Sequence, residues 1–214
     1  AARLWLPETR GAQPSKPLTF GSALRSYGQL LAKRRYMGYT LTSSFAMAGM
    51  FAYIAGSPFV FINLYHVPAE TYGWIFGTNA AGIIGLSQLN PMLLRRFTLD
   101  QMLTVGVALL AVSGLVLIGA VLLSFGGLFG IWLPVFAYVA CLGFVLPNAS
   151  ASAMAGEAAQ AGSAAGLMGV LQFVAGALAS AAVGALQDGT ALPMTGVIVV
   201  CALLSFITRW VMVR

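Results

Sequence analysis

Residues 99–125 read LDQMLTVGVALLAVSGLVLIGAVLLSF, and Asp100 is the only charged residue among them. An α-helix over this stretch, rising ~1.5 Å per residue, is long enough to cross the ~30 Å hydrocarbon core of a lipid bilayer. Apolar stretches of similar length lie at 39–65, 71–94, 128–153, 161–186 and 192–213. We therefore predict an all-α integral membrane protein in which residues 39–214 form a bundle of six transmembrane helices. Because the connections are short, successive helices should be antiparallel neighbours.

The composition of the whole chain supports a lipid environment. Of the 214 residues, 59% are hydrophobic and only 7% are charged, whereas a soluble domain carries about 25% charged residues. In lipid the backbone polar groups of each segment must be satisfied within that segment, which a helix achieves. The net charge of +6 does not indicate nucleic-acid binding, because the basic residues lie between apolar stretches instead of forming one polar surface.

The positions of the basic residues predict the topology. With six spans, all 11 Lys and Arg side chains fall on one side of the membrane: Arg3, Arg10, Lys16, Arg25, Lys33, Arg34, Arg35, Arg95, Arg96, Arg209 and Arg214. The opposite loops, around His66, Gly126 and Gly189, contain no Lys or Arg. By the positive-inside rule the basic side is cytoplasmic, so we predict that both ends of the chain are cytoplasmic.

Residues 1–38 form the segment before the first predicted span. Within it, 18–35 can form a basic amphipathic helix that lies on the membrane surface, since its apolar residues share one helical face. The chain begins Ala1-Ala2-Arg3, with neither a methionine nor the pattern of a signal peptide. We therefore expect the sequence to be a piece of a longer protein.

Three coincidences of glycine and proline predict an internal repeat. Pro147 follows Pro58 by 89 residues, and at the same offset Gly162 follows Gly73 and Gly166 follows Gly77. Because each repeat would hold three spans, an odd number, the two units would have opposite orientations in the membrane. The prolines would kink their helices and act as joints, while the glycine pairs would allow close, sliding helix contacts.

Charged side chains inside a membrane usually mark functional sites, but the acidic residues of this chain fall at predicted helix ends or in loops. We instead predict a ligand cavity lined by aromatic, methionine and amide side chains: Tyr53, Ser57, Phe61, Phe76, Asn79, Val145, Asn148, Met168 and Gln172. The alternative is that the amides only hydrogen-bond between helices. Cys141 and Cys201 lack metal-ligand spacing, so we expect neither a metal nor a cofactor.

Enzyme motifs are missing from the sequence. It contains no H-E-x-x-H, no G-x-S-x-G and no acidic pair within a span. An intramembrane serine protease would need a histidine inside a span, but His66, the only histidine, lies at a predicted membrane edge. We therefore expect a protein that is not an enzyme.

Several motifs resemble the Bcr/CflA-type drug exporters of the major facilitator superfamily. FAYIAGSPFVFI at 51–62 resembles that family's seventh helix, and supporting stretches are FGTN at 76–79, LPNA at 146–149, AGSAAG at 161–166 and LQF at 171–173. LWLPET at 4–9 resembles the end of the family's sixth helix, entering the central cytoplasmic loop. The similarity covers essentially the whole chain.

The resemblance implies half of a twelve-helix antiporter in a bacterial inner membrane, which exports amphiphilic drugs in exchange for protons by alternating access. The six spans would be helices seven to twelve, with the first and fourth lining the cavity, the second and fifth forming gating contacts, and the third and sixth facing lipid. The loop with Arg95 and Arg96 resembles a degenerate copy of the superfamily's basic loop motif. The family's proton-coupling acid and arginine belong to the N-terminal six-helix half, which this chain would need as its partner.

Two readings from other classes remain open at this stage. The chain could be a self-contained six-span protein that dimerises as a channel or small carrier, or it could be a purely structural membrane subunit. Another six apolar spans encoded in frame upstream of Ala1 would favour the half-transporter, whereas a start codon just before Ala1 would favour the self-contained protein.

Overall fold

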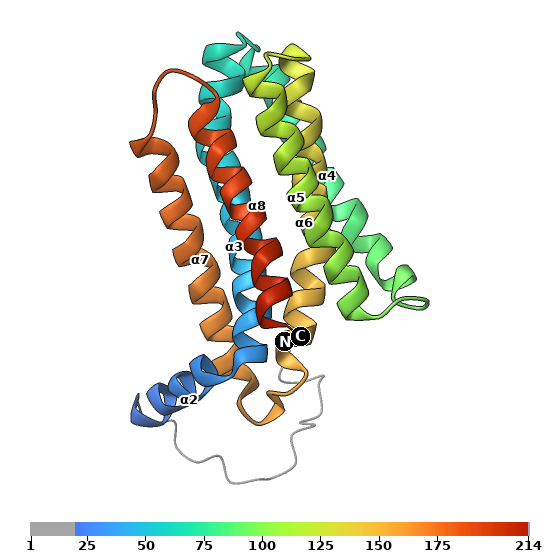
Figure 1. Ribbon diagram of the computed structural model, residues 1–214, viewed down its shortest axis with the longest axis vertical. Helices are drawn as coiled ribbons and strands as arrows, with labels where there is room; N and C mark the ends of the chain where they lie inside the picture. The colour runs from blue at the N-terminus through green and yellow to red at the C-terminus, as the bar shows by residue number, and fades with distance from the viewer. Residues whose placement is uncertain (1–19, 214) are drawn as a thin grey trace, which may run out of the picture.

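The computed structural model describes residues 20–213. The described residues contain helices and no strand, so the predicted all-α class is confirmed for them (Figure 1). The basic residues Arg3, Arg10, Lys16 and Arg214 and the LWLPET motif lie outside the described residues.

Within residues 20–213, a short helix and six long helices follow one another. The helices are α2 (Phe20–Ala32), α3 (Arg34–Pro58), α4 (Ala69–Leu93), α5 (Leu99–Leu122), α6 (Gly127–Met154), α7 (Ala161–Ala185) and α8 (Leu192–Met212). After Pro58, α3 continues as the π-helical segment η1 (Phe59–Leu64), and a 3-10 turn η2 (Ala158–Gln160) precedes α7. A proline lacks the N–H of an α-helical hydrogen bond, which accounts for the change to a wider turn at Pro58. Pro147, in contrast, lies within α6, which continues as an α-helix to Met154.

Among the described residues, five segments are long and apolar enough to cross a membrane: Arg34–Leu64, Leu99–Leu122, Gly127–Met154, Ala158–Ala185 and Leu192–Met212. Helix α4 has a comparable length of 25 residues, but polar residues such as Asn79, Gln88 and Asn90 reduce its mean hydropathy. The prediction of a sixth span at α4 therefore stays a prediction.

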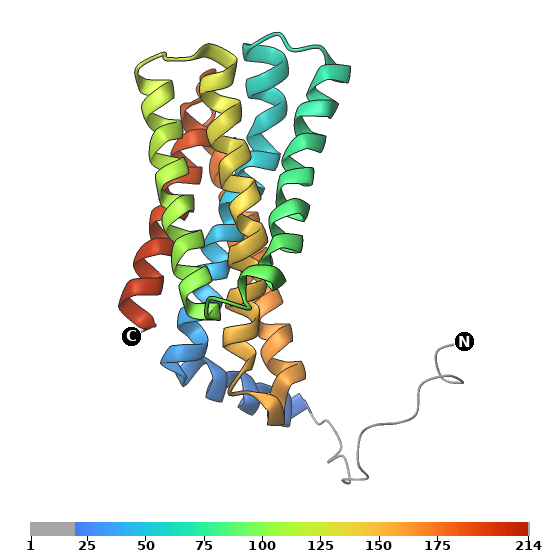
Figure 2. The same cartoon turned by 90° about the vertical axis from the view of Figure 1, so that its right-hand side faces the viewer.

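Helices α3 and α6 lie at the centre of the bundle. Helix α3 packs against α6, α7 and α8, while α6 packs against α3, α4 and α5, and α5 also packs against α8. Helices α4 and α7 consequently lie on opposite sides (Figures 1 and 2). These contacts map onto one another when α3, α4 and α5 are exchanged with α6, α7 and α8.

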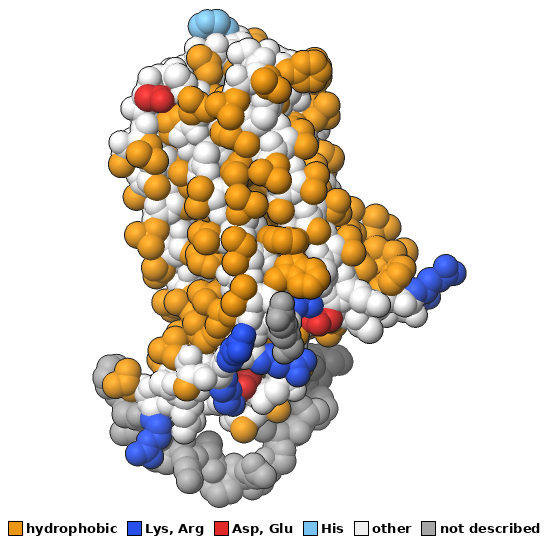
Figure 3. All heavy atoms as spheres, viewed as in Figure 1, with side chains coloured by type: hydrophobic (Ala, Val, Ile, Leu, Met, Phe, Trp, Pro, Cys, Tyr) orange, Lys and Arg blue, Asp and Glu red, His pale blue; other side chains and the backbone are white. Residues whose placement is uncertain are grey.

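The surface separates apolar and charged side chains. Apolar groups cover the length of the bundle, whereas Lys and Arg side chains gather at the end where α3 begins and α8 ends (Figure 3). Helix α2 lies across this end (Figures 1 and 2), with Leu24 and Leu31 exposed. Such a distribution fits a bundle whose sides face lipid and whose basic end faces water.

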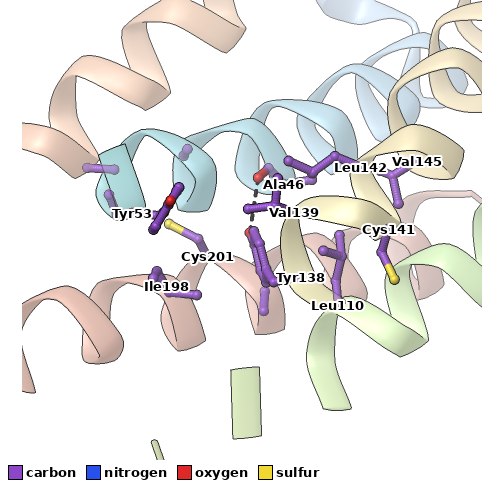
Figure 4. Packing of buried hydrophobic residues seen from close by; sticks show 14 of the residues in the cluster. Ala46, Tyr53, Leu110, Tyr138, Val139, Cys141, Leu142, Val145, Ile198 and Cys201 are labelled. Carbon is purple, nitrogen blue, oxygen red and sulfur yellow. Dashed lines mark hydrogen bonds between the residues drawn. The ribbon is translucent and has the colours of Figure 1, made fainter. Parts of the chain in front are cut away.

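Small residues bring the central helices together. Gly49 of α3 lies directly under the Tyr138 ring of α6, and the Tyr138 hydroxyl donates a hydrogen bond to the Ala46 carbonyl at 3.0 Å (Figure 4). On the other side of α6, a Cβ atom added at Gly143 would lie 2.5 Å from the Ile83 carbonyl oxygen and 2.8 Å from the Ser87 nitrogen. These are backbone atoms of α4, so glycine at 143 sets the spacing between α4 and α6.

We predict that Gly143→Ala destabilises the bundle by about 1–3 kcal/mol, because the added methyl group must push the α4 backbone away. The measurement is chemical unfolding of the purified protein in detergent, followed by circular dichroism. Gly119→Ala is the control, since nothing lies within 4 Å of a Cβ atom there and alanine favours a helix by up to about 1 kcal/mol. Equal stability of the two variants would contradict this role of Gly143.

Candidate functional site

Four aromatic rings form a continuous row between the end of α3 and the first half of α4. Phe61 lies 6.1 Å from Tyr72, and Tyr72 lies 6.3 Å from Phe76, measured between ring centroids. Phe76 in turn stacks on Tyr53 with centroids 5.8 Å apart and ring planes inclined by 17°. Such offset pairs are favourable contacts, so these rings stabilise the packing of α4 against the end of α3 and η1.

Two polar contacts run beside this row of rings. The Asn79 amide Nδ2 donates to the Tyr53 hydroxyl at 2.8 Å, and the Ser57 and Tyr72 hydroxyls lie 2.8 Å apart. Tyr53, Ser57, Phe61 and Asn79 are all buried, whereas Phe76 keeps 38% of its surface exposed. The hydrogen bonds fix the orientation of the rings, and Phe76 marks the open side of the arrangement.

A cavity of about 160 Å³ opens beside these residues. It lies between α3, α4 and α6 and is lined by Met50, Tyr53, Ile54, Phe76, Asn79, Ala80, Ile83 and Val139. Of the predicted cavity residues, Tyr53, Phe76 and Asn79 line it, whereas Ser57 and Phe61 are not among its lining residues. The lining residues Met50, Ile54, Ala80, Ile83 and Val139 were not among the predicted set, although Met50 and Ile83 lie one helical turn from Tyr53 and Asn79.

The structure places the other predicted residues elsewhere. Asn148 pairs with Asn90 of α4: Asn148 Nδ2 donates to Asn90 Oδ1 at 2.7 Å and Asn90 Nδ2 donates back at 3.3 Å. Val145 is buried and approaches Gly106 of α5. Sequence reasoning missed Asn90, although Asn79, Ile83, Ser87 and Asn90 follow the three-to-four-residue spacing of a single helical face.

Met168 and Gln172 lie on α7, which contacts α3 on a side away from α4. Gln172 Nε2 donates to the Ser43 hydroxyl of α3 at 3.2 Å, and the Ser150 hydroxyl of α6 lies 3.7 Å from the Met168 sulfur. Neither residue lines the cavity beside Tyr53. The nine predicted residues therefore fall into separate groups around the central helices α3 and α6.

The predicted glycine contacts do not lie between the described helices. A Cβ atom at Gly73, Gly77 or Gly162 would meet nothing within 4 Å, and one at Gly166 would meet only the Tyr27 hydroxyl oxygen, at 3.5 Å. These positions leave open strips along the outer helices α4 and α7. Arg95 and Arg96 are exposed in the turn after α4.

Two ion pairs at the basic end join segments that are far apart in the sequence: one links the connections before α3 and after α6, and the other links α5 to α8. Lys33 Nζ lies 2.8 Å from both carboxylate oxygens of Glu157, and Arg209 Nη2 lies 2.8 Å from Asp100 Oδ2. The Tyr39 hydroxyl also donates to Asp100 at 2.7 Å. The hydrogen bonds from Lys33 and from Gln160 hold the pKa of Glu157 below its ordinary value. Among residues 20–213 no group of three His, Cys, Asp or Glu residues could hold a metal ion.

A bundle of long apolar helices with a small aromatic pocket, and with its basic side chains at one end, is typical of a membrane transport protein. No protein-family model matches the chain. Two curated proteins do: it is 28% identical over 205 residues to a bicyclomycin resistance protein homolog of Haemophilus influenzae, and 31% identical over 201 residues to YdgK, an uncharacterized MFS-type transporter of Bacillus subtilis.

These alignments cover 96% and 94% of this chain but only 51% and 50% of the two relatives. The chain therefore spans about half the length of the curated relatives it matches. The predicted resemblance is confirmed: nearly the whole chain is related to half of a Bcr-like transporter of the major facilitator superfamily. Transporters of this superfamily are not enzymes, in agreement with the missing enzyme motifs.

We predict that Asn148→Leu destabilises the bundle by about 1–3 kcal/mol, because it leaves the buried Asn90 amide without its partner. The double variant Asn90→Leu/Asn148→Leu should recover much of this loss, since neither amide is then left unpaired. Unfolding free energies of the two single variants and the double variant measure the coupling. Losses that simply add in the double variant would contradict an amide pair.

We also predict that Glu157→Gln lowers the thermal midpoint at neutral pH, because it removes the ion pair with Lys33. The folded-state pKa of Glu157 lies below its ordinary value of 4.5, so the ion pair stabilises the fold above that value and is lost as the pH falls through the folded-state pKa. The difference from the wild type should therefore vanish in acid. Glu70→Gln, at the opposite end of the bundle, is the control, and a difference that persists in acid would refute the ion-pair explanation.

Proposed function

We propose that this chain is the C-terminal half of a proton-coupled exporter of amphiphilic drugs, with α3 to α8 as helices seven to twelve of a twelve-helix transporter. The aromatic and amide pocket between α3 and α4 is the observation that carries the proposal. A transporter needs a mostly apolar site with a few polar groups that orient its ligand, and Tyr53, Phe76 and Asn79 supply one. The pocket is small because these residues form only one wall of the substrate cavity, and the N-terminal six-helix half supplies the other.

Drug resistance as the physiological role rests on one relative. That relative is the bicyclomycin resistance protein homolog, which is 28% identical to this chain. The chemistry of the pocket favours amphiphilic molecules, because its apolar walls surround only a few hydrogen-bonding atoms.

Packing supports an alternating-access mechanism built on two inverted three-helix units. The contacts of α3, α4 and α5 correspond to those of α6, α7 and α8, in agreement with the 89-residue offset between Pro58 and Pro147. Rocking motions in transporters with inverted repeats occur around a central site. The open glycine strips of α4 and α7 would then contact the N-terminal half and form the gates.

Proton coupling is assigned to the N-terminal half. The acidic residues that the structure describes, Glu70, Asp100, Glu157 and Asp188, all lie in a first helical turn or between helices. None of them lies at mid-membrane depth, where a proton-carrying carboxylate would be expected. In the proposed topology the bundle lies in the bacterial inner membrane, and its basic end faces the cytoplasm.

The decisive experiment compares this chain with the protein that joins it to its N-terminal half. In liposomes loaded with a pH-sensitive dye, we expect drug-dependent proton movement from the complete transporter and none from residues 1–214 alone. The protein with an acidic-to-amide substitution in its N-terminal half is the matched control for the dye signal. Drug-dependent proton movement by residues 1–214 alone would favour the self-contained six-span protein instead.

A further inference from the structure

One atom of the candidate site has no hydrogen-bond partner. Asn79 is 1% exposed, and its amide Nδ2 donates to Tyr53, but its carbonyl oxygen Oδ1 is buried and unpaired. A buried carbonyl without a donor is unfavourable by about 1–3 kcal/mol. A hydrogen-bond donor would stabilise this buried oxygen, and none of the described residues supplies one.

The surroundings of Asn79 offer no protein donor to fill this role. Besides Tyr53 and Asn79, the cavity is lined only by apolar side chains: Met50, Ile54, Phe76, Ala80, Ile83 and Val139. The Tyr53 hydroxyl accepts from Nδ2 at the other end of the same amide and makes no hydrogen bond to Oδ1. Asn79 lines the cavity and its Oδ1 is buried, so a molecule that enters can supply the missing donor once the amide oxygen turns towards it.

The lining residues of the cavity indicate the shape and the charge of the ligand that it would accept. Phe76 stacks on Tyr53 and is 38% exposed, so a flat ring can extend the row of aromatic rings. Met50 is flexible and polarisable, which lets the wall adapt to different shapes. No lining residue is charged, and an unpaired charge would be strongly disfavoured here.

We propose that this cavity selects neutral, flat, apolar groups that carry one N–H or O–H donor, with Asn79 Oδ1 accepting the hydrogen bond. The proposal rests on the proposed transport function and narrows its substrate class. The donor is the selective feature, because a ligand without it leaves the buried carbonyl unpaired whereas a ligand with it does not.

Two small probes that differ in one donor test this directly. Indole carries an N–H group, and 1-methylindole has the same ring system without it. With the complete transporter in nanodiscs, equilibrium dialysis corrected for empty nanodiscs should give indole about 3- to 10-fold tighter binding, the range expected for one net hydrogen bond. Quinoline, a flat ring with an acceptor and no donor, should bind as weakly as 1-methylindole.

Substitutions in the pocket distinguish the effect of the hydrogen bond on binding from the effect of ligand size and ring stacking. Asn79→Leu should bring the ratio of the two affinities close to one, whereas a ratio caused by the extra methyl group would survive this substitution. Asn79→Ala serves the same purpose should the leucine variant fail to fold. Phe76→Ala should weaken both probes and preserve their ratio, because it removes the stacking surface and leaves the amide in place.

The possible failures have distinct meanings. Equal wild-type binding of indole and 1-methylindole, or a ratio that persists in Asn79→Leu, overturns the donor preference but leaves the pocket as a binding site. Tighter binding of quinoline than of indole overturns it as well, because the amide would then present its NH2 group. Absence of saturable binding by all three probes overturns both the donor preference and the pocket on which the proposed function rests.

Discussion

The lipid bilayer offers no hydrogen bonds, and this constraint governs how the polar side chains of the bundle are arranged. Helices satisfy their own backbones, so each polar side chain inside the bundle must find a partner on its own or a neighbouring helix. Ser205 of α8 donates to the Thr42 carbonyl, Ser180 of α7 donates to the Phe51 carbonyl, and Tyr138 of α6 donates to the Ala46 carbonyl. All three bonds end on α3, which explains why α3 is the helix around which α6, α7 and α8 assemble.

The same constraint separates two asparagines that look equivalent in the sequence. Asn148 and Asn90 satisfy one another almost completely, and Asn148 also donates to the Phe144 carbonyl. Their pair fastens α4 to α6 and leaves little hydrogen-bonding capacity for a ligand. Asn79 instead uses one end of its amide on Tyr53 and keeps the other end free beside a cavity. One helix therefore carries a structural amide near its end and, near its middle, the amide that we propose to bind ligand.

Sequence patterns predicted the helical class well because the solvent determines it: apolar stretches such as 99–125 have no other stable form in lipid. They also identified Tyr53, Phe76 and Asn79, since these residues recur at helical spacing on the first two predicted spans. The partner of Asn148 could not be predicted in the same way. Asn90 lies 58 positions before it, and the pairing depends on how closely α4 approaches α6 at Gly143. The Asp100–Arg209 ion pair escaped prediction for the same reason, since it requires the packing of α5 against α8.

A site built this way has consequences for transport. A ligand held mainly by aromatic and aliphatic contacts gains little that depends on its detailed shape, so a cavity of this kind accepts many molecules. A single unpaired carbonyl adds direction without demanding one particular structure, because both N–H and O–H groups can satisfy it. The site also changes little in charge when it fills and empties. In the exporter that we propose, energy for directional transport enters through groups that do change charge, and residues 20–213 keep their acidic side chains in first helical turns or between helices. Under this proposal binding and energy coupling are separated in space, which would let the pocket vary without disturbing the proton coupling.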